Sequence, residues 1–373
     1  MECRTHNRLW GDHLNTYEHV LRGSTKEPDM FCSYPARRIY MKKIVAGLVL
    51  ALPMLASGQA MAADKELIIS SWAAPVHTMN KDIFPWMISE MERCSGGSLT
   101  AKVEYGLAPP PAQYDTVRDG VADFGWIVYG YTPGKFETTK IAELPGNGGN
   151  AEDMSVAFQM THEKYLAAAK EAKGVKILTN YVHGPGHVNT VKPVKSYKDI
   201  VGMKLRVGGG VANDIGTALG VAGVNMPAPA VYEAVSSGVT EGVFFPMETM
   251  YAFKVAEVAK YTFRNPEGMY TTAFGLIMNA DSYDDLSSAH KKCIDGMTGV
   301  DMARRVGKWW DEADELGYVK FAEMGGKVTD ASAAEQAYFR EKTAGVEAKV
   351  LAGISERGVD AAAALKYFRS QLK

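Results

Sequence analysis

The sequence contains few cysteines and almost no net charge. It has 4 cysteines in 373 residues, and its 41 Lys and Arg nearly balance its 43 Asp and Glu, for a formal net charge of -2. So few cysteines exclude a scaffold built from disulfides. The balanced charge, without a block of basic residues, argues against a nucleic-acid partner. With 46% hydrophobic and 23% charged residues, the chain has the composition of a globular protein of two or three domains.

Long apolar runs are also missing, and a short apolar stretch lies well inside the chain. Residues 41–62 combine Met-Lys-Lys, the apolar stretch 44–55 and Ala-Met-Ala, which is the order of a secretory signal peptide. The apolar stretch is shorter than the ~20 residues that a membrane-spanning helix needs. We interpret residues 1–40 as a mis-annotated N-terminal extension, with translation starting at Met41; a long leader that is also removed is the alternative. The exported protein then begins at Ala63 and is soluble.

Only two cysteines, Cys94 and Cys293, belong to the exported part. In an oxidising compartment they can form a disulfide, but two buried free thiols fit the sequence equally well. Their spacing matches no metal-binding motif. The sequence leaves the pairing open.

The usual catalytic and cofactor motifs are absent as well. His162-Glu163 is not followed by the second histidine of a zinc-protease helix. The glycine clusters at 184–186 and 208–210 each have an asparagine three residues on, where a dinucleotide-binding loop needs glycine. The sequence has neither a Walker loop nor the nucleophile elbow of an α/β hydrolase. We therefore expect no enzyme activity and no cofactor, and a secreted hydrolase is the weaker alternative.

Strands and amphipathic helices alternate along the exported part, which indicates an α/β architecture. Two stretches, 119–125 and 237–243, share the order helix end, glycine, acidic residue, strand, and this favours two lobes of related build. A long amphipathic helix over 300–316, ending at Gly317, is expected to brace the lobes. The strands are expected at 67–71, 101–105, 124–128, 176–182 and 204–207.

Two segments carry candidate ligand-binding chemistry. His183 and His187 flank a glycine–proline turn; without a third ligand nearby, we favour neutral hydrogen-bonding groups over a metal site. In the strand at 204–207, Arg206 and Lys204 point to the same side. The glycines that follow let the backbone approach a ligand closely. From this pattern alone, Arg206 is either a ligand anchor or a surface residue of an edge strand.

Several segments together carry a family resemblance. The most distinctive runs from Pro193 through Asp199 and Gly202 to the Lys-Leu-Arg-Val at 204–207. On these residues the exported part resembles the DctP-type solute-binding subunits of tripartite ATP-independent periplasmic (TRAP) transporters. The resemblance implies a periplasmic α/β protein with two lobes, a hinge cleft and a long bracing helix. Weaker matches are Ser95-Gly96-Gly97, 120–124, Val231-Tyr232 and 238–241.

The same resemblance implies a role for Arg206 and a set of partners. Arg206 would clamp the carboxylate of a small organic acid, because a planar guanidinium offers two parallel donors that lysine lacks. The implied partners are a small and a large membrane subunit driven by an ion gradient, and we expect a monomer. A binding protein that serves a sensor kinase is the alternative. With hinges near His183 and Thr271, we expect lobe I to comprise 63–183 plus 272–311, and lobe II 184–271 plus 312–373.

Three positions depart from the family pattern. Gly186 stands where much of the family has a second arginine, Phe245 replaces an asparagine, and Val128 replaces an acidic residue. A hydroxyl-rich ligand would leave polar groups unpaired against such walls, at ~1–3 kcal/mol each. We therefore predict an aromatic or apolar monocarboxylate, or a 2-oxo acid, rather than a sialic or uronic acid. Because side chains alternate along a strand, we expect Phe245 rather than Phe244 to face the cleft. The predicted ligand-binding residues are Arg206, Phe245, His183, His187, Trp126, Tyr129, Trp72 and His77.

Overall fold

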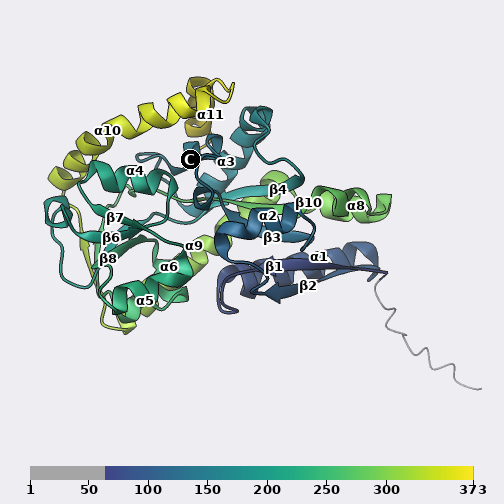
Figure 1. Cartoon of the computed structure of the whole chain (residues 1–373), viewed down its shortest axis with the longest axis horizontal. Helices are drawn as coiled ribbons and strands as arrows, with labels where there is room; N and C mark the ends of the chain where they lie inside the picture. The colour runs from purple at the N-terminus through teal and green to yellow at the C-terminus, as the bar shows by residue number, and fades with distance from the viewer. Residues whose placement is uncertain (1–63, 373) are drawn as a thin grey trace, which may run out of the picture. The chain divides into compact units, whose positions relative to one another are not determined.

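The computed structural model describes residues 64–372, and the predicted extension and signal peptide lie outside them. The chain forms two β-sheets with helices packed around them (Figure 1). We call the part built on the first sheet lobe I and the part built on the second sheet lobe II. The first sheet has the order β2-β1-β3-β10-β4, with β1 (Lys65–Ser71), β2 (Leu99–Tyr105), β3 (Phe124–Val128), β4 (Val175–Val182) and β10 (Ala273–Asn279). The second has the order β11-β9-β5-β8-β6-β7, with β5 (His187–Thr190), β6 (Lys204–Val207), β7 (Ala222–Asn225), β8 (Gly242–Phe245), β9 (Tyr261–Arg264) and β11 (Lys327–Asp330).

The two sheets share one strand plan. In lobe I, β1 lies between its parallel partners β2 and β3, and β10 runs antiparallel beside β3. In lobe II, β6 lies between its parallel partners β7 and β8, and β5 runs antiparallel beside β8. A left-handed glycine precedes β3 and β8 alike: Gly120 has a φ of 72° and Gly238 a φ of 77°. The predicted α/β architecture with two lobes of related build is therefore confirmed.

Helices pack on both sheets. A capping box at Ser196 and Asp199 opens the turn before β6. The helices are α1 (Phe84–Ser95), α2 (Gln113–Arg118), α3 (Ala151–Lys164), α4 (Gly210–Ala218), α5 (Val231–Ser236), α6 (Met247–Ala252), α7 (Ala280–Asp284), α8 (Ser288–Asp295), α9 (Gly299–Glu323), α10 (Ala333–Ser355) and α11 (Ala361–Gln371).

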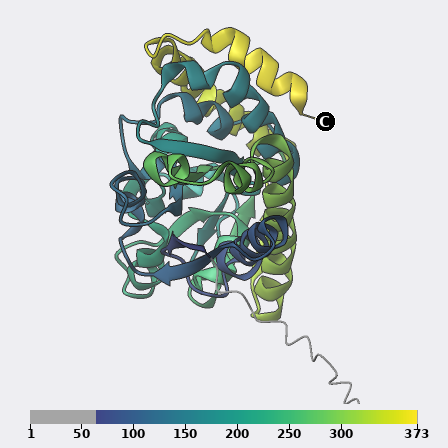
Figure 2. The ribbon, with the colours of Figure 1, turned by 90° about the vertical axis from the view of Figure 1, so that its right-hand side faces the viewer.

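The long helix α9 packs against α3 of lobe I and α6 of lobe II. Figure 2 shows it as a long light-green helix along the right-hand side of the view. The prediction that this helix ends at Gly317 is wrong, because it continues to Glu323. A Cβ atom at position 317 would lie 2.3 Å from the carbonyl oxygen of Met247. Glycine at this position therefore serves close packing against α6 rather than helix termination.

The polypeptide passes between the lobes at residues 183–186, at 265–272, along α9, and again along α10, which leads from β11 to α11. The first two connections contain His183 and Thr271, the expected hinge positions. The C-terminal helix α11 packs against α3 of lobe I, where it buries Leu365 and Phe368. This contact differs from the expected assignment of all of residues 312–373 to lobe II. The apolar face of α11 is the physical reason for the difference.

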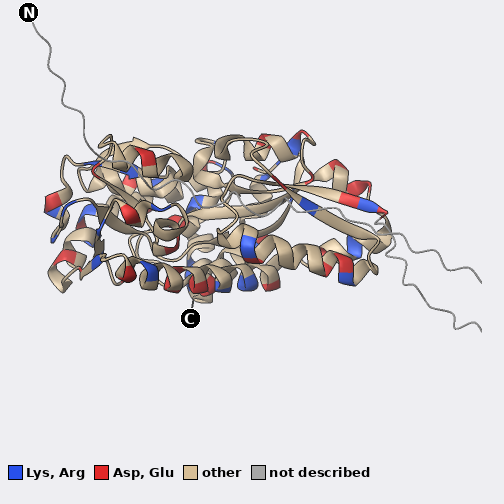
Figure 3. Cartoon of the chain, turned by 90° about the horizontal axis from the view of Figure 1, so that it is seen from below, with Lys and Arg blue, Asp and Glu red and all other residues tan. Residues whose placement is uncertain are grey.

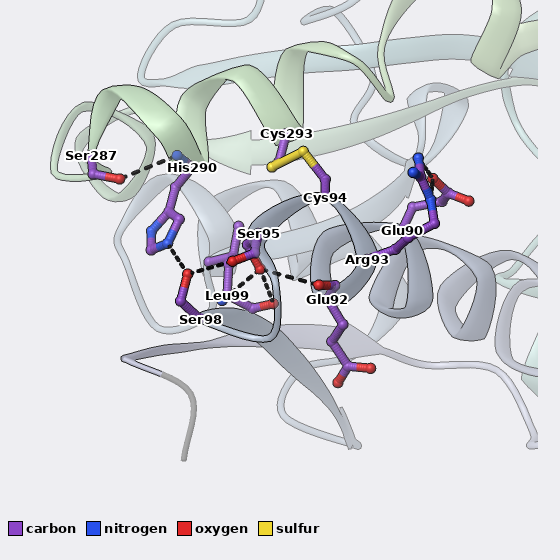
Figure 4. Close-up of a disulfide and its surroundings, with 10 residues drawn as sticks. All are labelled: Glu90, Glu92, Arg93, Cys94, Ser95, Ser98, Leu99, Ser287, His290 and Cys293. Atoms are coloured by element: carbon purple, nitrogen blue, oxygen red, sulfur yellow. Dashed lines mark hydrogen bonds and ion pairs between the residues drawn. A yellow bond between two sulfur atoms is a disulfide. The ribbon is translucent and has the colours of Figure 1, made fainter. Parts of the chain in front are cut away.

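A disulfide joins Cys94 of α1 to Cys293 of α8, with 5.6 Å between the Cα atoms (Figure 4). The structure thus decides between the two states that the sequence left open. Beside the bond, the Ser98 hydroxyl lies 2.9 Å from Nε2 of His290. The bridge and this contact hold α8 against α1 within lobe I.

Charged residues of both signs are interspersed along the helices of both lobes (Figure 3). Most of their ion pairs are exposed, such as the pair between Arg264 and Asp330 at 2.6 Å. Exposed pairs contribute little stability, ~0–1 kcal/mol each. Within residues 64–372, no helix is both long enough and apolar enough to cross a membrane.

Candidate ligand-binding site

A small cavity of about 40 Å³ lies between the two lobes. Its walls come from strand ends of both sheets, from the two connecting segments and from α9. Lobe I contributes Trp72, His77, Trp126, Val128, Tyr131 and Phe274; lobe II contributes Arg206, Gly208, Ala228, Phe245, Pro246, Thr249 and Phe253; the connections contribute His183, Tyr270 and Thr272; and α9 contributes Trp310.

Arg206 is buried in this cavity, with 3% of its surface exposed. It lies on β6, which has a neighbouring strand on each side, so the alternative of a surface residue on an edge strand is excluded. Its Nε donates to the carbonyl oxygen of Met226 (2.9 Å) and its Nη1 to that of Phe244 (3.3 Å). Its Nη2 donates to the hydroxyl of Tyr131 (3.1 Å). These partners are neutral and occupy three of five N–H groups, so two N–H groups of a buried cation remain for an anion.

Phe245 lies beside the guanidinium, with its ring centre 4.5 Å from Cζ of Arg206. This distance is typical of a cation–π contact, which helps to hold the guanidinium over the face of the ring. The preceding residue, Phe244, points to the other face of β8 and packs in the hydrophobic core. The structure thus places Phe245, and not Phe244, at the cavity.

Lobe I contributes a wall of stacked aromatic rings. Trp72 at the end of β1 stacks on Trp126 of β3, with ring centres 4.0 Å apart and an interplanar angle of 14°. Phe274 of β10 stacks on Trp310 of α9, with ring centres 5.2 Å apart and an angle of 21°. The rings present flat apolar surface against which an aromatic ligand can pack.

Two of the predicted histidines line the cavity in the neutral form. Burial lowers the pKa of His183 to about 4, and its Nε2 lies 2.8 Å from the hydroxyl of Thr272. Burial lowers the pKa of His77 to about 3. Its Nδ1 accepts from the backbone N–H of Met79 (3.2 Å), so the proton is on Nε2, which lies 3.4 Å from Glu248. These rings offer hydrogen bonds rather than charge.

Two other predicted residues, Tyr129 and His187, do not line the cavity. Side chains alternate along β3, so Trp126 and Val128 face the cavity whereas Tyr129 points away and donates to Oδ1 of Asn180 (2.6 Å). His187 is buried instead beside α9, with Nε2 2.8 Å from the hydroxyl of Tyr318. We therefore remove Tyr129 and His187 from the candidate site.

Not all of the glycines after Arg206 lie beside the ligand cavity, contrary to what the sequence suggested. Some of them allow the two lobes to approach each other closely. Gly208 lines the cavity, but a Cβ atom on Gly209 would lie 2.4 Å from the carbonyl oxygen of Gly130 in lobe I. Next to this contact, the buried carboxylate of Glu143 accepts from the N–H of Val211 in α4 (2.8 Å). Its other oxygen accepts from Ala273 N in β10 (3.0 Å), so Glu143 joins the two lobes. Burial raises the pKa of Glu143 to about 7.

The residues that the structure describes contain no group of three or more His, Cys, Asp and Glu side chains that could hold a metal ion. The charge of the cavity wall is therefore supplied by the guanidinium of Arg206.

Residues 73–353 match the DctP family, the bacterial extracellular solute-binding proteins of family 7. The chain belongs to this family. In its crystallised relatives the family fold serves TRAP transporters, so this chain is a DctP-type solute-binding protein of the TRAP class.

This DctP-type protein is similar to several solved structures. A TRAP periplasmic solute-binding protein from Bordetella bronchiseptica, with bound (R)-mandelate and (S)-mandelate, is 35% identical, with a TM-score of 0.80 and coverage of 83% of this chain and 98% of that one. A TRAP solute-binding protein from Rhodoferax ferrireducens, in complex with copurified benzoate, is 29% identical, with a TM-score of 0.78 and coverage of 83% and 97%. A curated solute-binding protein of Albidiferax ferrireducens is 24% identical over 208 residues, and this match spans 53% of this chain and 60% of that relative.

Sequence reasoning missed several residues of the cavity of this DctP-type protein. Phe274 lies opposite Val128 in the register of β10 and β3, strands that are about 150 residues apart in the chain. Tyr131 lies two residues beyond Tyr129, after a turn that reverses which side chain faces the cavity. Trp310 belongs to the aromatic face of the predicted long helix, and its periodicity was the one signal that pointed to a buried role.

Proposed function

We propose that this DctP-type protein is the periplasmic receptor for an aromatic monocarboxylate, which it delivers to the small and large membrane subunits of a TRAP transporter. The observation that carries the proposal is Arg206, a buried cation with neutral partners and two unused N–H groups. A carboxylate fits these donors as a bidentate partner and compensates the buried charge. The protein binds and releases this acid without changing it.

The walls around Arg206 favour an aromatic acid over a sugar acid. Phe245 beside the cation and the Trp72–Trp126 stack across the cavity provide apolar surface on both sides. A sugar acid would leave several hydroxyls unpaired there, at ~1–3 kcal/mol each. The neutral His183 and the hydroxyl of Thr272 can accommodate one polar substituent, such as a ring hydroxyl or a 2-oxo group.

Binding also accounts for the contacts between the lobes. A ligand that touches Arg206 in lobe II and the aromatic wall in lobe I stabilises the closed arrangement, because it gains contacts there that are absent when the lobes separate. The same closed arrangement would be the form that the membrane subunits receive.

A calorimetric and thermal-shift panel tests the proposal. We expect benzoate, 3-hydroxybenzoate and mandelate to raise the melting temperature in a concentration-dependent way, as ligands of the folded form do. Benzamide matches benzoate in shape but lacks the charge, so it should bind at least ~10-fold more weakly. Galacturonate should give no shift at concentrations that saturate with benzoate. A larger shift with galacturonate than with any aromatic acid would refute the proposed ligand class.

A further inference from the structure

Tyr131 occupies the boundary between two hollows of the protein. Tyr131 is the last residue of the short helical turn Tyr129–Tyr131, which follows β3 in lobe I. It lines the cavity that holds Arg206 and also a larger neighbouring hollow of about 430 Å³. Its ring centre lies 6.4 Å from that of Trp72. The phenol is thus placed where the ligand cavity meets the outer part of the cleft.

The hydroxyl oxygen of Tyr131 receives two hydrogen bonds from lobe II. Nη2 of Arg206 donates to it at 3.1 Å, and the backbone N–H of Ala228 donates to it at 2.9 Å. Neither group can accept a hydrogen bond in return, because a guanidinium and a backbone N–H are donors only. The two donors occupy the acceptor side of the oxygen, and the phenolic proton finds no acceptor in the described part of the chain.

We infer that the phenolic proton of Tyr131 is donated to the ligand's carboxylate, so that Tyr131 binds the same anion as Arg206 from the opposite lobe. This inference rests on the proposed function, because it needs an anionic acceptor beside Arg206. Since Nη2 of Arg206 already touches the phenol oxygen, an oxygen atom bound by the guanidinium lies next to the phenolic O–H. Because the Arg206 guanidinium and the Ala228 N–H can only donate, they orient this O–H away from lobe II and toward the shared cavity.

This arrangement makes the anion part of the contact between the lobes. Arg206 and Ala228 of lobe II bind the phenol oxygen, and the phenol binds the carboxylate that Arg206 also holds. A carboxylate strengthens the contact because it accepts the phenolic proton, which has no acceptor within residues 64–372. A neutral ligand of the same shape provides a weaker acceptor and gains less from Tyr131.

The first test is Tyr131→Phe, which removes the hydroxyl and keeps the ring. Hydrogen bonds to charged groups correspond to an affinity change of ~10-fold or more, so we expect benzoate to bind ~10-fold more weakly in calorimetry. Tyr114→Phe is the matched control, because that lobe I hydroxyl donates to the carbonyl oxygen of Lys173, outside the cavity. It should bind benzoate as the parent does.

Replacing Tyr131 with 3-fluorotyrosine separates a ligand-binding role from a structural one. Fluorination withdraws electrons from the ring, so it makes the phenol a stronger hydrogen-bond donor and a weaker acceptor. If the proton goes to the carboxylate, benzoate should bind more tightly, by ~2-fold or more. A phenol that serves only as acceptor for Arg206 and Ala228 gives weaker binding instead.

The outcomes also distinguish this inference from the proposed function. If the parent protein binds no aromatic acid, the proposed function fails. If the parent binds benzoate, and Tyr131→Phe binds it equally well or the fluorinated protein binds it no more tightly, the donor role of Tyr131 is overturned while the receptor function stands.

Discussion

The two walls of the cavity offer a ligand different chemistry although the two sheets share one strand plan. Lobe II supplies the guanidinium of Arg206 from β6, and lobe I supplies the stacked rings of Trp72 and Trp126 from β1 and β3. β6 has the same position in its sheet as β1 has in the other, and each of the two is paired with parallel strands. The repeated frame therefore fixes where side chains meet, and the identity of a few residues at the strand ends sets which ligand fits.

The largest effect on binding should come from Arg206→Lys, which alters the charged wall alone. Lysine keeps the charge but cannot hold the carbonyl oxygens of Met226 and Phe244 while presenting two parallel donors. We expect benzoate affinity in calorimetry to fall on the order of 100-fold. Arg264→Lys, at an exposed ion pair with Asp330, is the control and should bind normally. Unchanged affinity of Arg206→Lys would remove Arg206 from the site.

Phe245→Asn should have the next largest effect, because it makes the wall beside the cation polar. Aromatic acids lose apolar contact and should bind ~10-fold more weakly, whereas hydroxylated acids gain a hydrogen-bonding partner. A thermal-shift profile over both classes of acid measures this change in preference. Phe244→Leu, on the core face of the same strand, should lower stability and leave the profile as it is. An unchanged profile for Phe245→Asn would make Phe245 a core residue only.

Glu143→Gln tests the contact between the walls rather than either wall. The amide has one accepting oxygen, so either Val211 N–H or Ala273 N–H loses its acceptor. We expect apparent benzoate affinity to fall by ~5-fold at pH 8, corresponding to about 1 kcal/mol. Because burial raises the pKa of Glu143 to about 7, the difference from the parent should shrink at pH 6, where the parent carboxyl is protonated. A difference that grows toward low pH contradicts this role.

The smallest effect on binding is expected for His187→Gln, which lies outside both walls and should change stability instead. Burial lowers the pKa of His187 to about 3 from an ordinary value of 6.5. Below pH 6.5, His187 therefore binds a proton in the unfolded chain but not in the folded protein. The free energy of unfolding consequently decreases as the pH falls toward 3. Between pH 6.5 and 4.5 the variant should lose about 2 kcal/mol less unfolding free energy than the parent in denaturant titrations. Equal losses in the two proteins would show that His187 is not held neutral by burial.

Much of the frame was predictable because its signals are local. An apolar run located β3 to the residue, and an alternating segment did so for β6. The glycines at 120 and 238 marked the starts of equivalent strands. Arg206 was predictable through the family motif around it, whereas the strand pattern alone did not distinguish a buried anchor from a surface residue. Strand alternation also separated Phe245 from Phe244.

The missed and mistaken residues depend on contacts between distant parts of the chain. Phe274 reaches the cavity through its pairing with β3, and local sequence carries no signal of that register. Gly209 was expected to let the backbone approach a ligand and Gly317 to end a helix, but each is small because a backbone segment from elsewhere in the chain lies against it. Tyr129 was placed in the site because it follows β3 directly, and the sequence does not show which way the side chains of the next turn point.

A crystal structure of the protein grown with benzoate would show how Arg206 and the aromatic walls hold the acid. We expect both carboxylate oxygens within hydrogen-bonding distance of the Arg206 guanidinium, and the phenyl ring between Phe245 and the Trp72–Trp126 stack. A benzoate whose carboxylate is bound elsewhere, with Arg206 still bonded only to its three neutral partners, would contradict this expectation.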